Sequence, residues 1–389
     1  MIGKPWMLPI FCLLLLAITS LALATTQEEE HLGHLLYFDQ YLSLNHNQSC
    51  ASCHHPHAAF ADPLNADFPA DYVVSLGSDV TLNGGRNAPT SAYAAFIPIF
   101  HSDGDNYVGG QFWDGRADTL KDQAKGPFVN GVEMGLADAA AVMAAIADPR
   151  NPRSKFYQEL FLSLYDIDLS TLDLSDSVQV ANAYDKTAEA IARFEQTWRF
   201  TKFTSKYDYY LAGAAELTPQ ELAGLEIFNG KGNCTACHPS APEIKPDGCL
   251  VPPLFSNYSY ENLGLPKSEN PMIASFPIDY GLGGRLGDAA ENGKFRVQTL
   301  RNIASTPPYG HNGYFATIED MVLFLNTAGD GSWPPPEVDA DNVNREELGS
   351  LGLTPQEQAD LVAFLKTLDD CYAETTPKNF VLPPLTPLD

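Results

Sequence analysis

Two short cysteine and histidine motifs carry the residues whose types and spacing are best suited to chemistry. They are Cys-Ala-Ser-Cys-His at 50–54 and Cys-Thr-Ala-Cys-His at 234–238. In such a motif each thiol can form a thioether with a haem vinyl group, and the adjacent histidine then becomes an axial ligand of the iron. The sequence therefore predicts two covalently bound c-type haems, with thioethers at Cys50, Cys53, Cys234 and Cys237 and iron ligands at His54 and His238.

A zinc site is the main alternative for paired cysteines. Two Cys-x-x-Cys pairs that share one zinc ion usually lie about 15–20 residues apart. The pairs in this chain begin at positions 50 and 234. Two independent sites are therefore favoured over one shared metal ion.

The first 24 residues have the pattern of a secretory signal. Lys4 precedes a mostly apolar stretch over 8–23, and Ala22-Leu23-Ala24 offers a small-x-small cleavage site. The stretch is short for a membrane helix, although an uncleaved anchor is the alternative. We expect a periplasmic protein without a membrane span in the mature chain.

The net charge of the chain restricts its binding partners. The chain has 23 basic and 49 acidic residues, for a net charge of −26. Such a surface repels nucleic acid, and it either steers a basic partner or simply keeps the protein soluble.

Cys12 lies in the signal, which leaves Cys249 and Cys371 for a disulfide in an oxidising compartment, or as two unpaired thiols.

Helical patterns dominate the elements that must position these motifs. Capping boxes at 218–221 and 354–357 each place Pro at the first helical position and predict helices to about 228 and 368. Other helices are expected over 28–44, 136–147 and 177–200, with loops over 62–87, 101–110, 239–267 and 328–344.

The order helix, haem motif, long loop, helix occurs twice along the chain. We therefore predict a mainly α protein with two cytochrome c-like haem domains and long irregular loops. Its parts would be a signal peptide over 1–24, an N-terminal domain over 25–205 and a C-terminal domain over 206–389.

Further motifs, which follow one another in a fixed order, relate the chain to a known protein family. They include Gly-Gly-Arg-Asn-Ala-Pro-Thr at 84–90, Gln-Phe-Trp-Asp-Gly-Arg-Ala at 111–117, Gln-Ala-Lys-Gly-Pro at 123–127, Gly-Val-Glu-Met-Gly at 131–135 and Pro-Tyr-Gly-His-Asn-Gly at 308–313. With them the chain resembles the bacterial di-haem cytochrome c peroxidase family, which includes MauG, over essentially the whole mature sequence.

The resemblance implies a role for each matching residue. The N-terminal haem would be the peroxide site, with Glu133, Gln123 and Pro127 on its distal side. Trp113 would lie between the haems as an electron relay. The positions that hold a calcium ion in the family are Asn87, Thr306 and Pro308 in this chain.

The chemistry of peroxide cleavage supports the role of Glu133. Breaking the O–O bond requires a proton to move from one oxygen to the other, and a buried carboxyl group with a raised pKa suits this task. Considered alone, Glu133 would be a carboxylate that stabilises a helix N-terminus.

Departures from the family pattern bear on function. Many members carry a histidine before the Arg-Asn-x-Pro-Thr motif that blocks the peroxide site, whereas residues 76–86 contain none. This favours a site that is open at rest, as in MauG. MauG also has a Trp where this chain has Gly232, so protein oxidation would need another exit route.

A further departure concerns the distal ligand of the C-terminal haem. Leu325 occupies the usual ligand position and cannot bind iron. Met321 lies one turn earlier on the same helix face and is a candidate ligand. Tyr309 and Tyr314 are alternatives, and Met321 as a core residue is another.

The resemblance therefore implies an exported di-haem c-type peroxidase that uses H2O2 to form a high-valent haem state. In the MauG-like version it oxidises a Trp or Tyr side chain of a periplasmic partner protein. The alternative is an H2O2-scavenging cytochrome c peroxidase that a small cytochrome c or cupredoxin supplies with electrons. A third hypothesis is a non-catalytic di-haem electron carrier.

Overall fold

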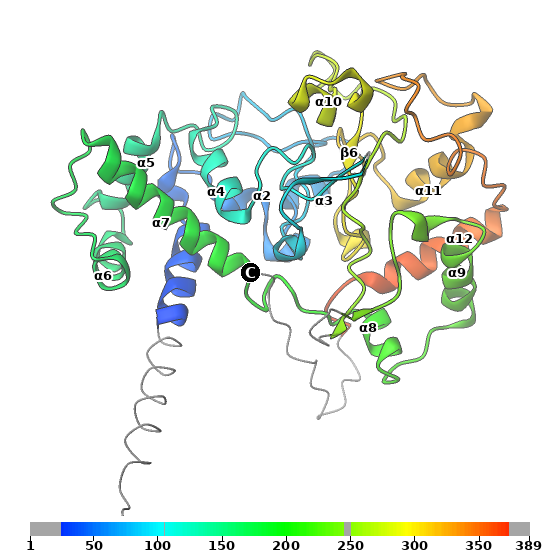
Figure 1. Cartoon of the computed structure of the whole chain (residues 1–389), viewed down its shortest axis with the longest axis horizontal. Coiled ribbons are helices and arrows are strands. Elements are labelled where there is room, and N and C mark those ends of the chain that lie inside the picture. The colour runs from blue at the N-terminus through cyan, green and yellow to red at the C-terminus, as the bar shows by residue number, and fades with distance from the viewer. Residues whose placement is uncertain (1–24, 105, 245–249, 373–389) are drawn as a thin grey trace, which may run out of the picture.

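The computed structural model describes residues 25–104, 106–244 and 250–372, and it is mainly helical, as predicted (Figure 1). The first half contains a helix over 25–37 and helices α2 (Cys50–Cys53), α3 (Pro63–Asp67), α4 (Leu120–Val129), α5 (Ala139–Ala147), α6 (Ser154–Tyr165) and α7 (Ser177–Glu195). The second half contains α8 (Lys206–Leu211), α9 (Pro219–Asn229), α10 (Gly281–Leu286), α11 (Ile318–Thr327) and α12 (Pro355–Leu365).

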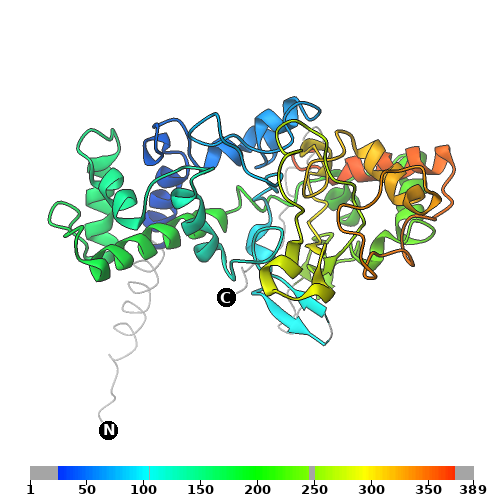
Figure 2. The same ribbon diagram turned by 90° about the horizontal axis from the view of Figure 1, so that it is seen from above.

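Strands in the described residues are short and pair in three two-stranded antiparallel sheets. They are β1 (His101–Asp103) with β2 (Asn106–Val108), β3 (Glu243–Ile244) with β4 (Leu250–Val251), and β5 (Tyr260–Glu261) with β6 (Phe295–Arg296). The β1–β2 hairpin reaches over to the second half, where Val108 bridges Ser259, and Figure 2 shows it beside α10.

Two large hydrophobic clusters form the core. The first is built almost wholly from side chains between Leu32 and Phe203, and the second from side chains between Tyr207 and Leu368. Figure 1 shows the corresponding elements on the left and on the right of the molecule. The predicted domain boundary at 205 remains a prediction, which this division supports.

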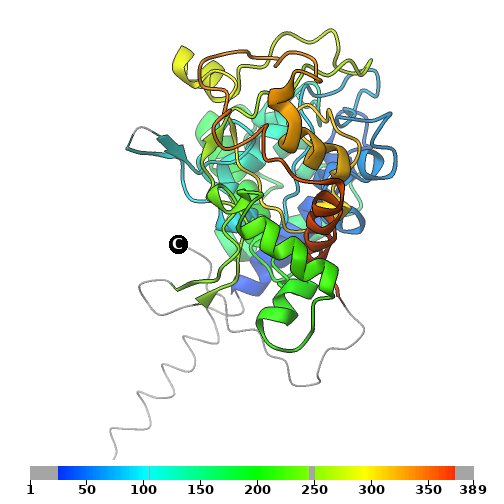
Figure 3. The same cartoon turned by 90° about the vertical axis from the view of Figure 1, so that its right-hand side faces the viewer.

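In each half, the helix before the haem motif crosses the last long helix at a glycine. A Cβ atom on Gly33 would lie 1.9 Å from the Ala190 carbonyl oxygen of α7. A Cβ atom on Gly224 of α9 would lie 2.0 Å from the Asp360 carbonyl oxygen of α12. The two backbones can approach this closely only because neither glycine has a side chain, and Figure 3 shows α9 against α12.

Most expected helices are present, with ends that their caps explain. Both predicted capping boxes exist, at Thr218 before α9 and Thr354 before α12. The helix expected over 136–147 begins only after Asp138, whose side chain accepts a hydrogen bond from the Ala141 N–H. The predictions of loops over 62–87, 101–110 and 239–267 are wrong in part, because α3, the β1–β2 pair and strands β3 to β5 form there. The helix expected over 28–44 ends at 37, and α6, α8 and α10 were not predicted.

Candidate functional site

The first Cys-x-x-Cys-His motif forms a single helical turn that presents His54. The His54 backbone N–H donates to the Cys50 carbonyl oxygen at 2.9 Å, and its ring Nδ1 lies 3.2 Å from the Phe60 carbonyl oxygen. Burial lowers the pKa of His54 and keeps the imidazole neutral. When Nδ1 donates to a carbonyl, Nε2 is left as a lone-pair donor for a metal.

The second motif repeats this arrangement. His238 Nδ1 lies 2.7 Å from the Phe255 carbonyl oxygen, and burial lowers the pKa of His238 to about 4. Both Phe60 and Phe255 have left-handed backbone conformations, with φ of 62° and 50°. This uncommon conformation for a bulky residue turns each carbonyl toward its histidine.

A threonine fixes each of these turns. Thr90 Oγ1 donates to the Ala59 carbonyl oxygen and Thr299 Oγ1 to the Leu254 carbonyl oxygen, both at 2.6 Å. Sequence reasoning gave no role to either residue. Thr90 belongs to the motif at 84–90, and Thr299 lies in the segment Phe-Arg-Val-Gln-Thr-Leu-Arg-Asn at 295–302.

Helices α4 and α11 occupy corresponding positions in the two halves. An isolated antiparallel β-bridge pairs two residues that are six positions apart in each half. It pairs Gln111 with Ala117 in one half and Tyr309 with Phe315 in the other. Two residues later a threonine caps the next helix, at Thr119 for α4 and Thr317 for α11. Counting four and eight residues from each cap matches Gln123 and Pro127 of α4 with Met321 and Leu325 of α11.

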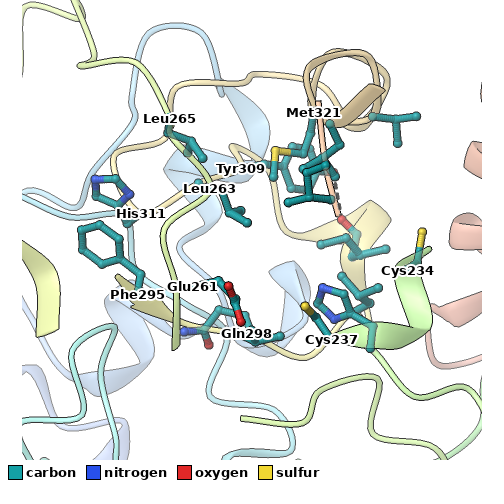
Figure 4. Close-up of a pocket in the computed structure, with 18 of the residues that line it drawn as sticks. Cys234, Cys237, Glu261, Leu263, Leu265, Phe295, Gln298, Tyr309, His311 and Met321 are labelled. Carbon is teal, nitrogen blue, oxygen red and sulfur yellow. Dashed lines mark hydrogen bonds between the residues drawn. The ribbon is translucent and has the colours of Figure 1, made fainter. Parts of the chain in front are cut away.

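The space beside the second motif fits a haem. A cavity of about 260 Å³ is lined by Cys234, Cys237 and His238, and Figure 4 shows Met321 on the wall opposite Cys237. Tyr309 also lines it, but its hydroxyl donates to the Ile303 carbonyl oxygen at 2.8 Å. Tyr314 is not among the described residues that line the cavity.

Orphaned polar atoms mark the space beside the first motif. Burial raises the pKa of both thiols, that of Cys53 to about 12. Gln48 Oε1 and Ser75 Oγ are buried without a hydrogen-bond partner in the described part of the chain, although Gln48 Nε2 lies 3.6 Å from Cys53 Sγ. Unpartnered buried groups beside two thiols fit a bound group that completes the site.

Glu133 lies in the turn after α4, within electrostatic range of the first motif. Its charge contributes to the raised pKa of Cys50 and Cys53. Burial raises the pKa of Glu133 itself, while Arg116 and a 2.8 Å hydrogen bond from Asn130 Nδ2 oppose that rise. The environment therefore gives Glu133 the raised pKa that a proton-transfer group needs.

Gln123 and Pro127, the other residues expected on the distal side, both lie in α4. Pro127 lies within α4, and its carbonyl oxygen accepts the Met134 N–H at 3.1 Å, which ties the Glu133 turn to the helix. Gln123 lies one turn before Pro127 on the same face of α4. No hydrogen bond joins Gln123 to Glu133 among the described residues.

Trp113 lies between the two halves. Its indole Nε1 donates to the Asn87 carbonyl oxygen at 2.8 Å, and its ring meets Phe295 and His311 edge-on at 6.4 and 6.5 Å. Trp113 also lines the cavity beside His238. Its position between the halves suits the predicted relay.

The predicted calcium residues line this same cavity. They are Asn87, Thr306 and Pro308. The described residues contain no group of three His, Cys, Asp or Glu side chains that could hold a metal ion. A calcium ion here would rest on amide and carbonyl oxygens, which it accepts, and the site remains a prediction.

An ion-pair network that was not foreseen joins the halves near Trp113. Arg86 contacts Asp114 at 2.7 Å and Asp279 at 2.6 Å, and Arg116 contacts Asp114 at 3.0 Å. Arg86 and Asp114 both belong to motifs quoted above, so their positions were visible but their partners were not.

Two further predictions concern residues that the structure does not describe. Cys249 is not among the described residues, so a disulfide with the exposed Cys371 remains a prediction. The signal peptide over 1–24 also lies outside them. Within the described segments, no helix combines the length and apolar character needed to cross a bilayer.

Comparison with known proteins finds relatives that match most of the chain. Residues 27–216 match the family model of the di-haem cytochrome c peroxidases. The chain is 39% identical to the methylamine utilization protein MauG of Paracoccus denitrificans, over 94% of this chain and 96% of that protein. It is 30% identical to cytochrome c551 peroxidase of Nitrosomonas europaea, over 87% and 78%.

A solved structure has the same fold. The di-haem peroxidase BthA of Burkholderia thailandensis matches with a TM-score of 0.74 and 29% identity, over 90% of this chain and 88% of that one.

Proposed function

Because the chain belongs to the di-haem cytochrome c peroxidase family that includes MauG, and is thus a di-haem peroxidase, we propose that it is a periplasmic enzyme that uses H2O2 to oxidise a partner protein. The two haems of the family would be held by Cys50, Cys53 and His54, and by Cys234, Cys237 and His238. When bound, they supply the redox chemistry that these side chains lack.

The loop beside Glu133 carries this proposal. The Ser78 N–H donates to the Glu133 carbonyl oxygen at 2.7 Å, and Ser78 Oγ donates to Asn47 Oδ1 at 2.8 Å. The loop is therefore fixed beside Glu133, and residues 76–86 include no histidine that could occupy the proposed peroxide site. A site without an internal blocking ligand can admit peroxide at rest, as expected of a MauG-like enzyme.

Each residue of the two sites has its own proposed role. Glu133 accepts a proton from one peroxide oxygen and returns it to the departing oxygen, while Gln123 orients the peroxide and Pro127 limits the space above it. Trp113 relays electrons between the two haem sites. Met321, matched in register with Gln123, would be the distal ligand of the second site.

Mixing resting protein with H2O2 in a stopped-flow spectrometer tests the open site. We expect an immediate change in the haem spectrum without prior reduction. No change until one electron is added would show that an internal ligand blocks the site and would contradict the proposal.

Replacing Glu133 with Gln tests the proton transfer. The rate of O–O cleavage should fall by roughly 10²–10⁴-fold, the range for a positioned acid–base group. Glu159→Gln, at an exposed glutamate of α6, is the matched control and should react like the parent. If Glu133→Gln also reacts like the parent, Glu133 only stabilises its turn.

The second candidate function is peroxide scavenging. The relative named cytochrome c551 peroxidase favours it. Rapid steady-state turnover of peroxide with a reduced small cytochrome c or cupredoxin would support scavenging. Slow turnover together with a peroxide-dependent mass change in a co-purified periplasmic protein would support protein oxidation.

A further inference from the structure

Arg296 in β6 is a buried cation without an acidic partner. Its residue exposure is 3%, and no ion pair to Asp or Glu involves it within the described segments. The other buried arginine, Arg301, differs because it pairs with Asp208 at 2.8 Å, and the half-buried Arg86 pairs with Asp279. A buried charge without a counter-ion costs several kcal/mol, so an anion should complete this site.

The hydrogen bonds of Arg296 hold its side chain in place. Nε donates to the Phe112 carbonyl oxygen at 3.2 Å, and Nη2 to Gln298 Oε1 at 3.1 Å. Its backbone N–H donates to the Trp113 carbonyl oxygen at 2.8 Å. Neutral acceptors therefore orient the guanidinium without neutralising it, and burial lowers the pKa of Arg296 accordingly.

Arg296 and Gln298 both line the cavity beside His238. The acidic side chains around this cavity have other hydrogen-bond or ion-pair partners. Asp279 binds Arg86 and Glu261 accepts from Asn344 Nδ2 at 3.2 Å. Glu337, the third, lies 3.4 Å from His311 Nε2. The missing anion must therefore come from the group that fills the cavity.

We propose that Arg296 binds a propionate of the haem attached to Cys234 and Cys237 and holds that edge of the haem beside Trp113. A haem carries two propionates, and the planar guanidinium suits a carboxylate. The proposal rests on the second haem, which the family implies, and holds for protein oxidation and scavenging alike.

A fixed positive charge beside this haem should stabilise its reduced state, because oxidation adds a further positive charge to the iron. Arg296 would thereby set the reduction potential of the second site. Its link to the Trp113 backbone would place this control next to the proposed relay.

Spectroscopic potentiometry of the two-haem protein tests the proposal. In Arg296→Gln, the reduced-to-oxidised ratio of the second haem at a fixed solution potential should fall about tenfold, which corresponds to 59 mV for one electron. Arg345→Gln, which removes an exposed arginine paired with Asp339, is the matched control and should leave the ratio within about twofold of the parent. An unchanged ratio in Arg296→Gln would overturn the proposal.

Arg296→Lys keeps the charge and guards against a variant that fails to fold. It should restore most of the ratio, while the propionate bending mode in the resonance Raman spectrum shifts because the planar donor is lost. A parent-like bending mode in Arg296→Lys would show that the guanidinium does not touch the propionate.

Discussion

At the scale of single residues, Glu133 is subject to opposing influences. Burial raises its pKa, whereas the charge of Arg116 and the hydrogen bond from Asn130 stabilise the carboxylate. A base must be deprotonated to act. The rate of the peroxide reaction should therefore fall as the pH drops through a pKa above that of an ordinary glutamate.

Asn130→Ala tests this balance. The variant loses the donor that stabilises the charged form, so the pKa of Glu133 should rise and the pH–rate profile should move to higher pH. Stopped-flow rates measured across the acidic range would show the shift. A profile that stays in place would mean that a group other than Glu133 controls it.

Trp113→Phe separates relay from packing. The variant removes the N–H that satisfies the Asn87 carbonyl oxygen, at a cost of about 1 kcal/mol. The first haem should still react with peroxide at nearly the parental rate, while the spectral response of the second haem is delayed. Rapid-mixing spectra follow both haems, and an undelayed second response would reduce Trp113 to a packing residue.

At the scale of elements, the glycine crossings decide how each half closes. Alanine usually favours a helix over glycine by about 0.5–1 kcal/mol. At Gly33 and Gly224 it should instead destabilise by about 1–3 kcal/mol or more, because the new methyl group meets a backbone oxygen.

Urea unfolding of Gly33→Ala and Gly224→Ala measures this cost. Gly131→Ala is the control, because nothing lies within 4 Å of the added Cβ. Equal stabilities for all three variants would show that the helices can move apart freely.

The sequence was informative about elements that local chemistry specifies. The haem motifs, the capping boxes at Thr218 and Thr354, and the helical class follow from short patterns, and the structure confirms the caps and the class. The carbonyl partners of His54 and His238 could not be predicted. They depend on left-handed turns at Phe60 and Phe255, where propensity would not place a phenylalanine.

At the scale of the whole molecule, Arg86 joins the halves. Burial alone would raise the pKa of Asp279, but the bond with Arg86 outweighs it and holds that pKa below its usual value. A depressed carboxyl pKa gives stability that is present above the unfolded pKa and lost as the pH falls through the folded pKa. The junction should therefore weaken in acid.

Arg86→Gln tests this junction. It removes the shared cation from Asp114 and Asp279 and should cost about 1.5–3 kcal/mol near neutral pH. Calorimetry should show the two halves melting further apart in temperature than in the parent. One unchanged transition would mean that other contacts suffice to couple them.

The predicted division at 205 came from motif order alone. Interfacial partners such as Arg86 with Asp279 lie far apart in sequence, and no local pattern pairs them. For the same reason the unpaired Arg296 could be recognised only once its surroundings were known.

The matched caps and bridges of the two halves are what a duplicated ancestral unit would leave behind. If each copy kept its threonine-capped helix, the copies could diverge in chemistry by changing two side chains, Gln123 and Pro127 in one and Met321 and Leu325 in the other. Division of labour between the two irons would then have required little rebuilding of the scaffold, and the same two positions become the place to exchange their duties by design.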